Sequence, residues 1–524
     1  MSASTQLARV IVRQIIEAGI TDAVISPGSR NAPLTLALFA AEEKGLIKLH
    51  VKIDERTAAF FALGITKATK RAVPVICTSG TAVANFHPAV LEASHSNLPL
   101  FVITADRPAE LRRTGANQTT EQARIFGKAV RYFADVSGPA FPLELPLNAL
   151  QSGPVHLNIQ FDEPLIGDSD SSWLDGLKIT PPKVFDRKKP GTLRPKSNRG
   201  VLVIGHDRAG FSVDEIKTFA EKLGWPVISE DPLSFEGAIS HASVFLTSKT
   251  NLKVLTPDTV VVIGRTTLSR SINSLISMAY KTIVIDPRMA TVDSDRMADQ
   301  RFTALPDLDV SPVDPDWVAK WEKLSQRAAK VISEISEWSE QLIGREIASK
   351  IPADTSLYIS SSRPIRDIEG FATARSGVDT FANRGLAGID GNISTALGIA
   401  ANREKTIAIL GDLSFLHDLT GLVNKGAINL KIYVINNDGG GIFSTLPARG
   451  AHGFERVFGT PHGMDLVSIA SALGVKAKKI SKLTELHQDL SEPINGISVI
   501  EIEVPDREAN ADFLKNLYAK MDSL

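Results

Sequence analysis

The sequence predicts an α/β protein built from three doubly wound parallel-sheet domains. Short runs of β-branched residues recur along the chain, and each ends in Gly, Asp, Ser or Asn before a helix-like stretch. Because these runs do not alternate with polar residues, we expect strands that are covered on both faces, as in parallel sheets. The clearest runs are Pro74–Gly80, Leu98–Asp106, Val201–Gly205, Thr259–Gly264, Thr282–Asp286, Leu357–Ser361, Thr406–Asp412 and Ile432–Asn437.

Two shifts in composition divide the chain. Residues 166–199 hold a polar run and then a stretch rich in Pro, Lys and Arg, which is typical of a linker. A second break, rich in Asp and Pro, covers residues 305–315 and precedes a long helical stretch, Trp317–Lys350. We therefore expect α/β domains at 1–165, 200–335 and 345–524, with residues 166–199 as a linker.

The first domain opens with a regular order of elements. Gln6–Glu17 has the apolar periodicity of an amphipathic helix, and strand Ala23–Ile25 follows it. Next come a helix over Leu34–Glu42, with Asn31 as its expected N-cap and Pro33 in its first turn, a strand over Leu46–Ile53 and a helix over Thr57–Lys67.

The composition excludes several classes of function. Lys plus Arg (58) balances Asp plus Glu (59), so no overall field attracts nucleic acid, and we expect no such partner. No apolar run approaches the ~20 residues of a membrane-spanning helix, and no signal-peptide pattern is visible. We therefore expect no membrane insertion and a cytoplasmic location. The single cysteine, Cys77, excludes a multi-cysteine metal site, and its apolar neighbours predict a core thiol.

One β-α-β crossover in the third domain gathers oxygen ligands. Strand Thr406–Leu410 ends in Gly411 and Asp412, the stretch Leu413–Gly426 is helix-like, and strand Leu430–Ile435 leads to Asn437 and Gly439. The tips of neighbouring parallel strands lie ~5 Å apart. A carboxylate, an amide oxygen and a backbone carbonyl suit Mg²⁺ that completes its octahedron with water and diphosphate oxygens. The alternative is an ordinary crossover with turn-forming residues at its ends.

Gly411-Asp412, followed 25 residues later by Asn437, resembles the diphosphate and metal motif of thiamine diphosphate enzymes. The resemblance extends over about two thirds of the chain, and the middle domain matches only in its α/β character. Further matching segments are Ser26–Leu34, Asp54–Arg56, Thr78–Asn85, Thr104–Pro108, Gly115–Gln118, Asn383–Gly385 and Gly388–Gly391.

The resemblance implies a cofactor, thiamine diphosphate, held with Mg²⁺ or Mn²⁺. It implies a pyrimidine-binding first domain, a diphosphate- and metal-binding third domain, and Glu55 as the catalytic residue that hydrogen-bonds N1′ of the aminopyrimidine. By itself Glu55 is more typical of a helix's first turn, where an acidic residue offsets the dipole, and the resemblance reverses this preference. The implied cofactor-binding residues are Glu55, Gly388, Ile389, Gly411, Asp412, Leu413, Ser414, Asn437 and Ile442, and the implied metal ligands are Asp412, Asn437 and Gly439.

The motifs are most similar to those of family members that act in menaquinone biosynthesis. This implies a transferase-type carboligase that decarboxylates 2-oxoglutarate, adds the four-carbon unit to isochorismate by 1,4-addition and releases CO₂. It also implies at least a homodimer, with a homotetramer left open. Both substrates are dicarboxylates, which explains several pocket arginines. The implied substrate-binding residues are Ser29, Arg30, Arg107, Asn117, Gln118, Ser362, Arg366, Arg384, Phe443 and Leu446.

Two other functions remain open, another thiamine-dependent 2-oxo acid decarboxylase or ligase resembling acetohydroxyacid synthase, and a catalytically silent diphosphate-binding protein. Arg363 and Arg375 are interpreted as surface charges, and the histidines, His462 among them, receive no role. Asp438 stands where many relatives have Asn, so it adds a negative charge beside the metal motif. In the middle domain, the candidates for a substrate contact are Arg265, Arg270, Arg288 and Arg296.

Overall fold

The computed structural model describes residues 2–137, 144–181, 191–288, 298–423 and 426–524. The chain divides into two compact units. The N-terminal unit comprises Met1–Phe185, Gly385–Glu404 and Leu416–Leu430. The C-terminal unit comprises Asp186–Arg384, Lys405–Phe415 and Lys431–Leu524.

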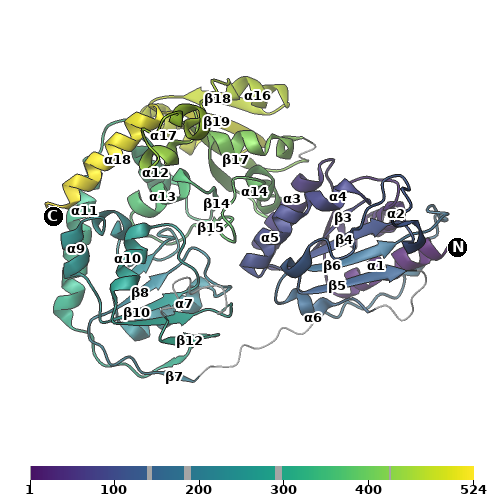
Figure 1. Ribbon diagram of the computed structural model, residues 1–524, viewed down its shortest axis with the longest axis horizontal. Helices are drawn as coiled ribbons and strands as arrows, with labels where there is room; N and C mark the ends of the chain where they lie inside the picture. Colours follow the sequence, from purple (N-terminus) through teal and green to yellow (C-terminus); the bar gives the residue numbers. More distant parts are fainter. Residues whose placement is uncertain (1, 138–143, 182–190, 289–297, 424–425) are drawn as a thin grey trace. The chain divides into compact units, whose positions relative to one another are not determined.

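A six-stranded sheet of order β2-β1-β3-β4-β6-β5 forms the centre of the N-terminal unit, and its strand pairs are parallel (Figure 1). Its elements in chain order are α1 (Ala3–Glu17), β1 (Asp22–Ile25), α2 (Ala32–Glu43), β2 (Lys48–Val51), α3 (Glu55–Thr69), β3 (Val73–Cys77), α4 (Thr81–Asn85), α5 (His87–Ser96), β4 (Leu100–Asp106), β5 (Tyr132–Ser137), α6 (Leu147–Leu150) and β6 (Val155–Gln160). Helix α14 (Asn392–Ala400) also belongs to this unit and packs on α3.

Both faces of this sheet are buried. Ile76 and Ile103 belong to the core that α1 and α2 cover, while the alternate residues Val75 and Val102 lie on the other face. Glycines set the close approach of α3 and α14. A Cβ on Gly64 would lie 2.2 Å from the Thr395 carbonyl oxygen, and one on Gly398 would lie 2.1 Å from that of Phe61. Only residues without a side chain allow this contact.

The C-terminal unit holds a five-stranded sheet of order β12-β11-β10-β8-β9 and a six-stranded sheet of order β15-β14-β16-β17-β19-β18 (Figure 1). The elements around the first sheet are β8 (Gly200–Ile204), α7 (Val213–Leu223), β9 (Val227–Ser229), α8 (Ala242–Phe245), α9 (Lys249–Val254), β10 (Thr259–Ile263), α10 (Arg270–Met278), β11 (Lys281–Ile285) and β12 (Gln300–Phe302). Strands β7 (Thr192–Leu193) and β13 (Asp307–Leu308) pair beside it.

The second sheet of this unit carries the predicted crossover. Its elements are α12 (Glu340–Lys350), β14 (Ser356–Ile359), α13 (Arg363–Phe371), β15 (Asp379–Phe381), β16 (Thr406–Gly411), α15 (Asp412–His417), β17 (Leu430–Asn436), α16 (Leu466–Ala472), β18 (Lys476–Ile480), α17 (Leu483–Ser491), β19 (Ile497–Glu503) and α18 (Arg507–Met521). The preceding helix, α11 (Pro315–Ser333), packs on the first sheet, since Trp317 and Trp321 share a core with residues of β8 and β10. No helix within the described ranges combines the length and the apolar character needed to cross a membrane.

The predicted α/β class is confirmed, since the strand pairs described in these sheets are parallel and helices separate the strands along the chain. The predicted long helix Trp317–Lys350 is two helices, α11 and α12. The predicted helix Leu413–Gly426 ends at His417, because the buried Asp418 turns away to accept hydrogen bonds from the backbone and hydroxyl of Ser394. Cys77 is a buried thiol, as expected, and burial followed by the nearby Glu55 raises its pKa.

Candidate active site

The loops that follow strands β1, β3 and β4 bring two arginines together in the N-terminal unit. Arg107 Nη1 donates to Ser79 Oγ at 2.6 Å and to the Gln118 carbonyl at 2.7 Å. Arg30 Nη1 donates to the Phe161 carbonyl at 2.9 Å, and its buried Nε has no partner among the described residues. Burial, followed by the charge of Arg30, lowers the pKa of Arg107. We call Arg30, Ser79, Arg107 and Gln118 the cationic edge.

The cationic edge contains little negative charge to offset its arginines. Arg30 forms an ion pair with the exposed Glu163 at 3.4 Å, and among the described residues this is the ion pair of the cationic edge. Gly28 lets the loop after β1 approach β3, since a Cβ there would lie 2.3 Å from Thr78 Cβ. The predicted partners Ser29 and Asn117 are exposed. Arg107 donates to neutral acceptors, and Arg30 shares its charge with one exposed carboxylate, so the two neighbouring guanidinium groups suit an anion with more than one carboxylate.

Asn31 differs from the prediction. It occupies the N-cap position of α2, but its side chain makes no capping hydrogen bond. Its Nδ2 instead donates to the Ser26 carbonyl at 2.9 Å, which closes the turn that presents Ser29 and Arg30. Pro33 lies in the first turn of α2, as predicted.

Glu55 is the first residue of α3, whose N-cap Asp54 accepts from the Thr57 amide. Its side chain is half-buried, beside an exposed Ile53 and a buried Lys52. The Lys52 ammonium lies 4.2 Å from the centroid of the Phe61 ring, and burial lowers its pKa to about 8. Glu55 therefore lies at a boundary between apolar core and solvent.

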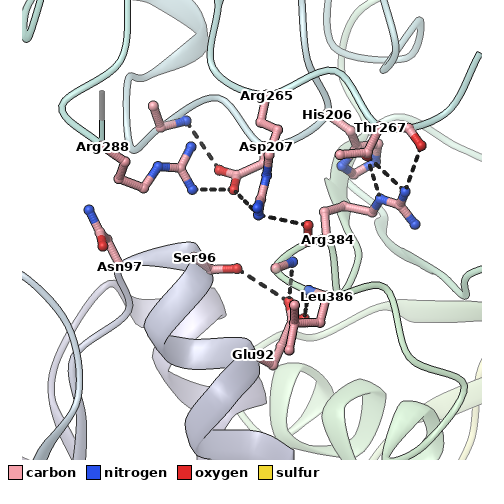
Figure 2. A network of polar contacts seen from close by, with 12 residues as sticks. Glu92, Ser96, Asn97, His206, Asp207, Arg265, Thr267, Arg288, Arg384 and Leu386 are labelled. Atoms are coloured by element: carbon pink, nitrogen blue, oxygen red, sulfur yellow. Dashed lines mark hydrogen bonds and ion pairs between the residues drawn. The ribbon is translucent and has the colours of Figure 1, made fainter. Parts of the chain in front are cut away.

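The loop with Gly388 and Ile389 is fixed to α5 by a buried carboxylate. Glu92 accepts from the backbone amides of Gly385 and Leu386, each at 2.7 Å (Figure 2). The Ile389 side chain is half-buried in the N-terminal unit. These two hydrogen bonds to one buried carboxylate give the loop a defined conformation.

In the C-terminal unit, the tips of β16 and β17 converge as the spacing predicts. Asp412 Oδ2 accepts from the Gly439 amide at 2.7 Å, and Oδ1 accepts from the Leu413 amide at 2.7 Å. Asp412 is buried. We call residues 436–441 the metal loop. A Cβ on Gly439, whose φ is +132°, would lie 2.1 Å from the Gly459 carbonyl oxygen, so this position requires glycine.

Next to Asp412, Asn437 has a side-chain oxygen that accepts no hydrogen bond from the described residues. Its Nδ2 donates to the buried Glu340, while its Oδ1 is buried and has no hydrogen-bond partner among the described residues. A buried polar atom without a partner is costly, so it indicates a ligand. Together with the Asp412 carboxylate, this amide oxygen fits a hard cation such as Mg²⁺. The described residues contain no cluster of three or more His, Cys, Asp or Glu side chains that could hold a metal ion.

Three models of thiamine pyrophosphate enzymes match the chain. The N-terminal TPP binding domain matches residues 5–125, the middle domain 169–359 and the C-terminal TPP binding domain 370–502. Relatives named 2-succinyl-5-enolpyruvyl-6-hydroxy-3-cyclohexene-1-carboxylate synthase share 37% identity in Saccharopolyspora erythraea and 38% in Thermobifida fusca, over 97% and 98% of this chain and 97% of each relative. One from Bacillus cytotoxicus shares 34%, over 97% of this chain and 95% of its own.

The chain belongs to this synthase family. The predicted thiamine diphosphate enzyme of the transferase type, its cofactor and its place in menaquinone biosynthesis are thereby confirmed, as is the expected set of three thiamine-enzyme domains. The individual site residues remain predictions.

A second arginine pair lies in the C-terminal unit of this synthase. Arg384 donates to Thr267 Oγ1 at 2.8 Å and to Ser361 Oγ at 3.4 Å, and Arg366 Nη1 donates to the Ser362 carbonyl at 2.6 Å (Figure 2 shows Arg384 with Thr267). Burial, followed by the charges of Arg384 and Arg363, lowers the pKa of Arg366. Sequence analysis did not identify Thr267, whose contact spans 117 residues.

A buried carboxyl group accompanies this pair. Burial, together with the nearby Glu230, raises the pKa of Glu369 well above its usual value, and its Oε1 has no partner among the described residues. Burial therefore disfavours the negative charge of Glu369, so this carboxyl group offsets the charges of Arg366 and Arg384 less than an exposed carboxylate would.

Arg363 and Arg375 are not the surface charges that the sequence suggested. Arg363 is mostly buried and pairs with Glu340 at 3.4 Å and with Asp367. Arg375 is half-buried and donates to the carbonyls of Ala348, Ser349 and Ile351 at the end of α12. Both side chains have structural partners: Arg363 pairs with buried carboxylates, and Arg375 donates to backbone carbonyls.

Among the middle-domain candidates, Arg288 is bound to Asp286 and Asp207. Arg265 lies 3.5 Å from Asp207 and donates to the Arg384 carbonyl (Figure 2 shows Asp207 with Arg288 and Arg265). Arg270 is exposed at the start of α10, and Arg296 lies outside the described residues. Carboxylates already offset the charges of Arg265 and Arg288.

Apolar residues follow the metal loop. Ile442 and Phe443 lie in the short helix Gly441–Thr445 and Leu446 follows it; all three are half-buried. The Phe443 ring packs against Phe458, with centroids 5.6 Å apart. At the tip of β16, no heavy atom lies within 4 Å of the position that a Cβ on Gly411 would take, so this position is open. Leu413 is half-buried and Ser414 is buried.

Asp438 lies within the metal loop, between Asn437 and Gly439. With φ at +58°, its carboxylate turns outward and accepts from the His462 and Gly463 amides at 2.9 and 2.8 Å. Partial burial raises its pKa, but these two amides outweigh burial and hold the pKa below its usual value. His462 was assigned no role from the sequence, yet its ring contacts Asp412 at 3.2 Å, and this hydrogen bond raises the pKa of the ring.

Proposed function

We propose that this synthase decarboxylates 2-oxoglutarate and adds the four-carbon unit to isochorismate by 1,4-addition, with thiamine diphosphate and Mg²⁺ as cofactors. The observation that carries the proposal is the cationic edge, where Arg30 and Arg107 lie close together and donate to hydroxyl and carbonyl acceptors, with the exposed Glu163 as a carboxylate beside Arg30. Two neighbouring guanidinium groups suit the two carboxylates of one dicarboxylate substrate. The second pair, Arg366 and Arg384, suits the carboxylates of the other substrate.

The metal loop fits the cation that the family uses. The Asp412 carboxylate, the Asn437 Oδ1 and the Gly439 carbonyl would hold Mg²⁺ or Mn²⁺ with the diphosphate, supported by Gly411, Leu413 and Ser414. When bound, thiamine diphosphate supplies the electron sink for the bond that breaks as CO₂ leaves. The protein supplies position, charge and exclusion of water.

The remaining side chains act on protons and on substrate orientation. Glu55 would hold a proton at N1′ of the aminopyrimidine, and Gly388 and Ile389 would support the same part of the cofactor. Ser29, Asn117, Gln118 and Ser362 offer hydroxyl and amide groups to the substrates. Ile442, Phe443 and Leu446 would line the site and exclude water, which strengthens every charged contact inside it.

We also propose that the enzyme works as a homodimer or a homotetramer in the cytoplasm, with domains at 1–165, 200–335 and 345–524 joined to a linker at 166–199. The N-terminal unit exposes large apolar side chains on α2 and on and after β2, next to Glu55. These side chains are Leu36 (47% exposed), Phe39 (49%), Val51 (40%) and Ile53 (62%). Exposed apolar residues of this kind mark surfaces for association.

The deciding experiment is release of CO₂ from 2-oxoglutarate with Mg²⁺ and thiamine diphosphate, with and without isochorismate. We expect fast turnover only when isochorismate is present. Turnover of pyruvate alone would favour a different 2-oxo acid decarboxylase or ligase. A protein that binds no thiamine diphosphate would be a silent diphosphate-binding chain.

Glu55→Gln tests the assigned proton. The variant keeps the shape of the side chain but not its charge, so we expect cofactor binding to persist and kcat to fall by about 100-fold or more, as for loss of a general acid or base. Turnover and cofactor affinity are measured together. Glu43→Gln, an exposed position in the same unit, serves as the control. Full activity of Glu55→Gln would contradict the role.

A further inference from the structure

The segment 460–464 and the π-helix before it, Glu455–Gly459, fold back against the metal loop. The Gly459 carbonyl accepts from the Gly440 amide at 2.7 Å. The next residues, 460–464, carry His462. This segment belongs to the same compact unit as Asp412 and Asn437. The ring of His462 is 7% exposed, so it is packed into the protein.

The hydrogen bonds of the His462 ring define its tautomer. The Met464 amide donates to Nδ1 at 3.0 Å, so Nδ1 acts as an acceptor. In a neutral imidazole the other nitrogen then carries the proton. Nε2 therefore donates to Asp412 Oδ2, 3.2 Å away. A backbone amide on one side of the ring and a carboxylate on the other leave the ring little freedom to rotate.

Asp412 accepts three donors from three segments. The Leu413 amide comes from its own helix, the Gly439 amide from the metal loop, and Nε2 from residue 462. The two amides lie on elements that the fold fixes anyway. The ring of His462 adds a side-chain donor to these two amides, and it contacts the Oδ2 side of the carboxylate.

We propose that His462 is a positioning residue that holds the Asp412 carboxylate in the orientation required by the metal and diphosphate. This inference rests on the proposed function, because it takes Asp412 as a metal ligand. Partners that orient a metal ligand through a hydrogen bond are worth 10–100-fold in metal affinity.

The competing interpretation is that His462 only secures its own segment. The backbone contacts argue against this. The His462 and Gly463 amides are already bound by Asp438, and the Gly459 carbonyl is bound by Gly440. The segment therefore keeps these contacts without the ring, and removal of the imidazole should act on Asp412.

The test uses three substitutions of the full-length protein. Glutamine places an amide N–H near the position of Nε2, asparagine places one near Nδ1, and alanine removes both. Binding of Mn²⁺ in the presence of thiamine diphosphate is followed by electron paramagnetic resonance of the free ion. The control is His487→Ala, since His487 pairs with a different carboxylate, Glu346, at 2.8 Å.

We expect His462→Ala and His462→Asn to raise the Kd for Mn²⁺ by about 10–100-fold, while His462→Gln stays within about 3-fold of the wild type. His487→Ala should bind as the wild type does. Equal losses in all three His462 variants, or no loss in any, would overturn the positioning role. If the wild type itself binds no Mn²⁺, the proposed metal site fails instead.

Discussion

The cationic edge and the metal loop share one architecture and carry opposite charge. Both form where parallel strands end, in sheets of six strands each. The cationic edge gathers two guanidinium groups around hydroxyl and carbonyl acceptors. The metal loop places an amide oxygen without a described partner next to the carboxylate of Asp412. The topology supplies the place, and the side chains decide whether an anion or a cation binds there.

The comparison also separates binding groups from structural ones. Arg107 is held by neutral acceptors, whereas Arg363 and Arg288 are surrounded by carboxylates. A guanidinium group that is already paired with carboxylates has little attraction left for a substrate. The same rule applied to oxygen marks Asn437, whose Oδ1 has no donor, against Asn436, whose amide group binds Glu501 and the Asp438 backbone.

Asp412→Asn tests the metal loop and should have the largest effect. The substitution keeps the shape and removes the negative charge, so we expect Mg²⁺ affinity to fall by at least about 100-fold, more than for a supporting residue. Isothermal titration with thiamine diphosphate present measures it. Asp465→Asn, at an exposed helix cap, is the control. Wild-type affinity in Asp412→Asn would remove the assigned contrast between the two regions.

Arg107→Met tests the cationic edge. A hydrogen bond to a charged group is worth about 1.5–3 kcal/mol, so kcat/KM should fall by about 10- to 150-fold. Affinity for Mg²⁺ and thiamine diphosphate should stay as in the wild type, because the metal loop is untouched. The control is Arg113→Met, a side chain that is 84% exposed. A loss of metal affinity together with unchanged kcat/KM would reverse the assignment.

These two regions also differ in how far the sequence predicts them. The metal loop follows from one crossover, so Asp412, Asn437 and Gly439 were accessible from strand ends and spacing. The cationic edge joins loops after three strands, and Arg30 and Arg107 entered through a resemblance. What the sequence missed depends on long-range contacts, such as His462 with Asp412, 50 residues apart, and Thr267 with Arg384.

The elements were more predictable than their ends. Buried strands such as Thr259–Ile263 follow from continuous Val and Ile runs. The end of α15 at His417 does not, because Asp418 is taken by Ser394, which lies 24 residues earlier. A local pattern cannot show which distant backbone group a buried carboxylate will accept from. The same reason explains Arg375, whose partners lie at the end of α12.

His156→Gln tests the support under the cationic edge. Burial lowers the pKa of His156 to about 3, against the weaker opposite effect of Asp135, and its Nε2 lies 2.8 Å from Thr104 Oγ1. The unfolded chain takes up a proton below pH ~6.5, and the folded chain only near pH 3. Stability from this group is therefore lost as the pH falls from 6.5 toward 3.

The loss amounts to about 1.4 kcal/mol per pH unit at most. Hydrogen exchange of the β4 and β6 amides between pH 6 and pH 4 measures it, because exchange reports the local stability of this sheet. The wild type should lose more protection than His156→Gln, after correction for the intrinsic exchange rate. The strands around the metal loop should respond equally in both proteins. Parallel pH curves for β4 and β6 would contradict the assignment.

Thr267→Val makes the smallest change and tests whether the second arginine pair behaves like the first. Valine keeps the shape of threonine but lacks the hydroxyl that accepts from Nε and Nη2 of Arg384. A net hydrogen bond is worth about 0.5–1.5 kcal/mol, so kcat/KM should fall by about 2- to 12-fold, mainly through KM. Thr267→Ser, which keeps the hydroxyl, should restore most of it. If serine and valine lose equally, the hydroxyl does not position Arg384, and neutral acceptors would then distinguish binding arginines only at the cationic edge.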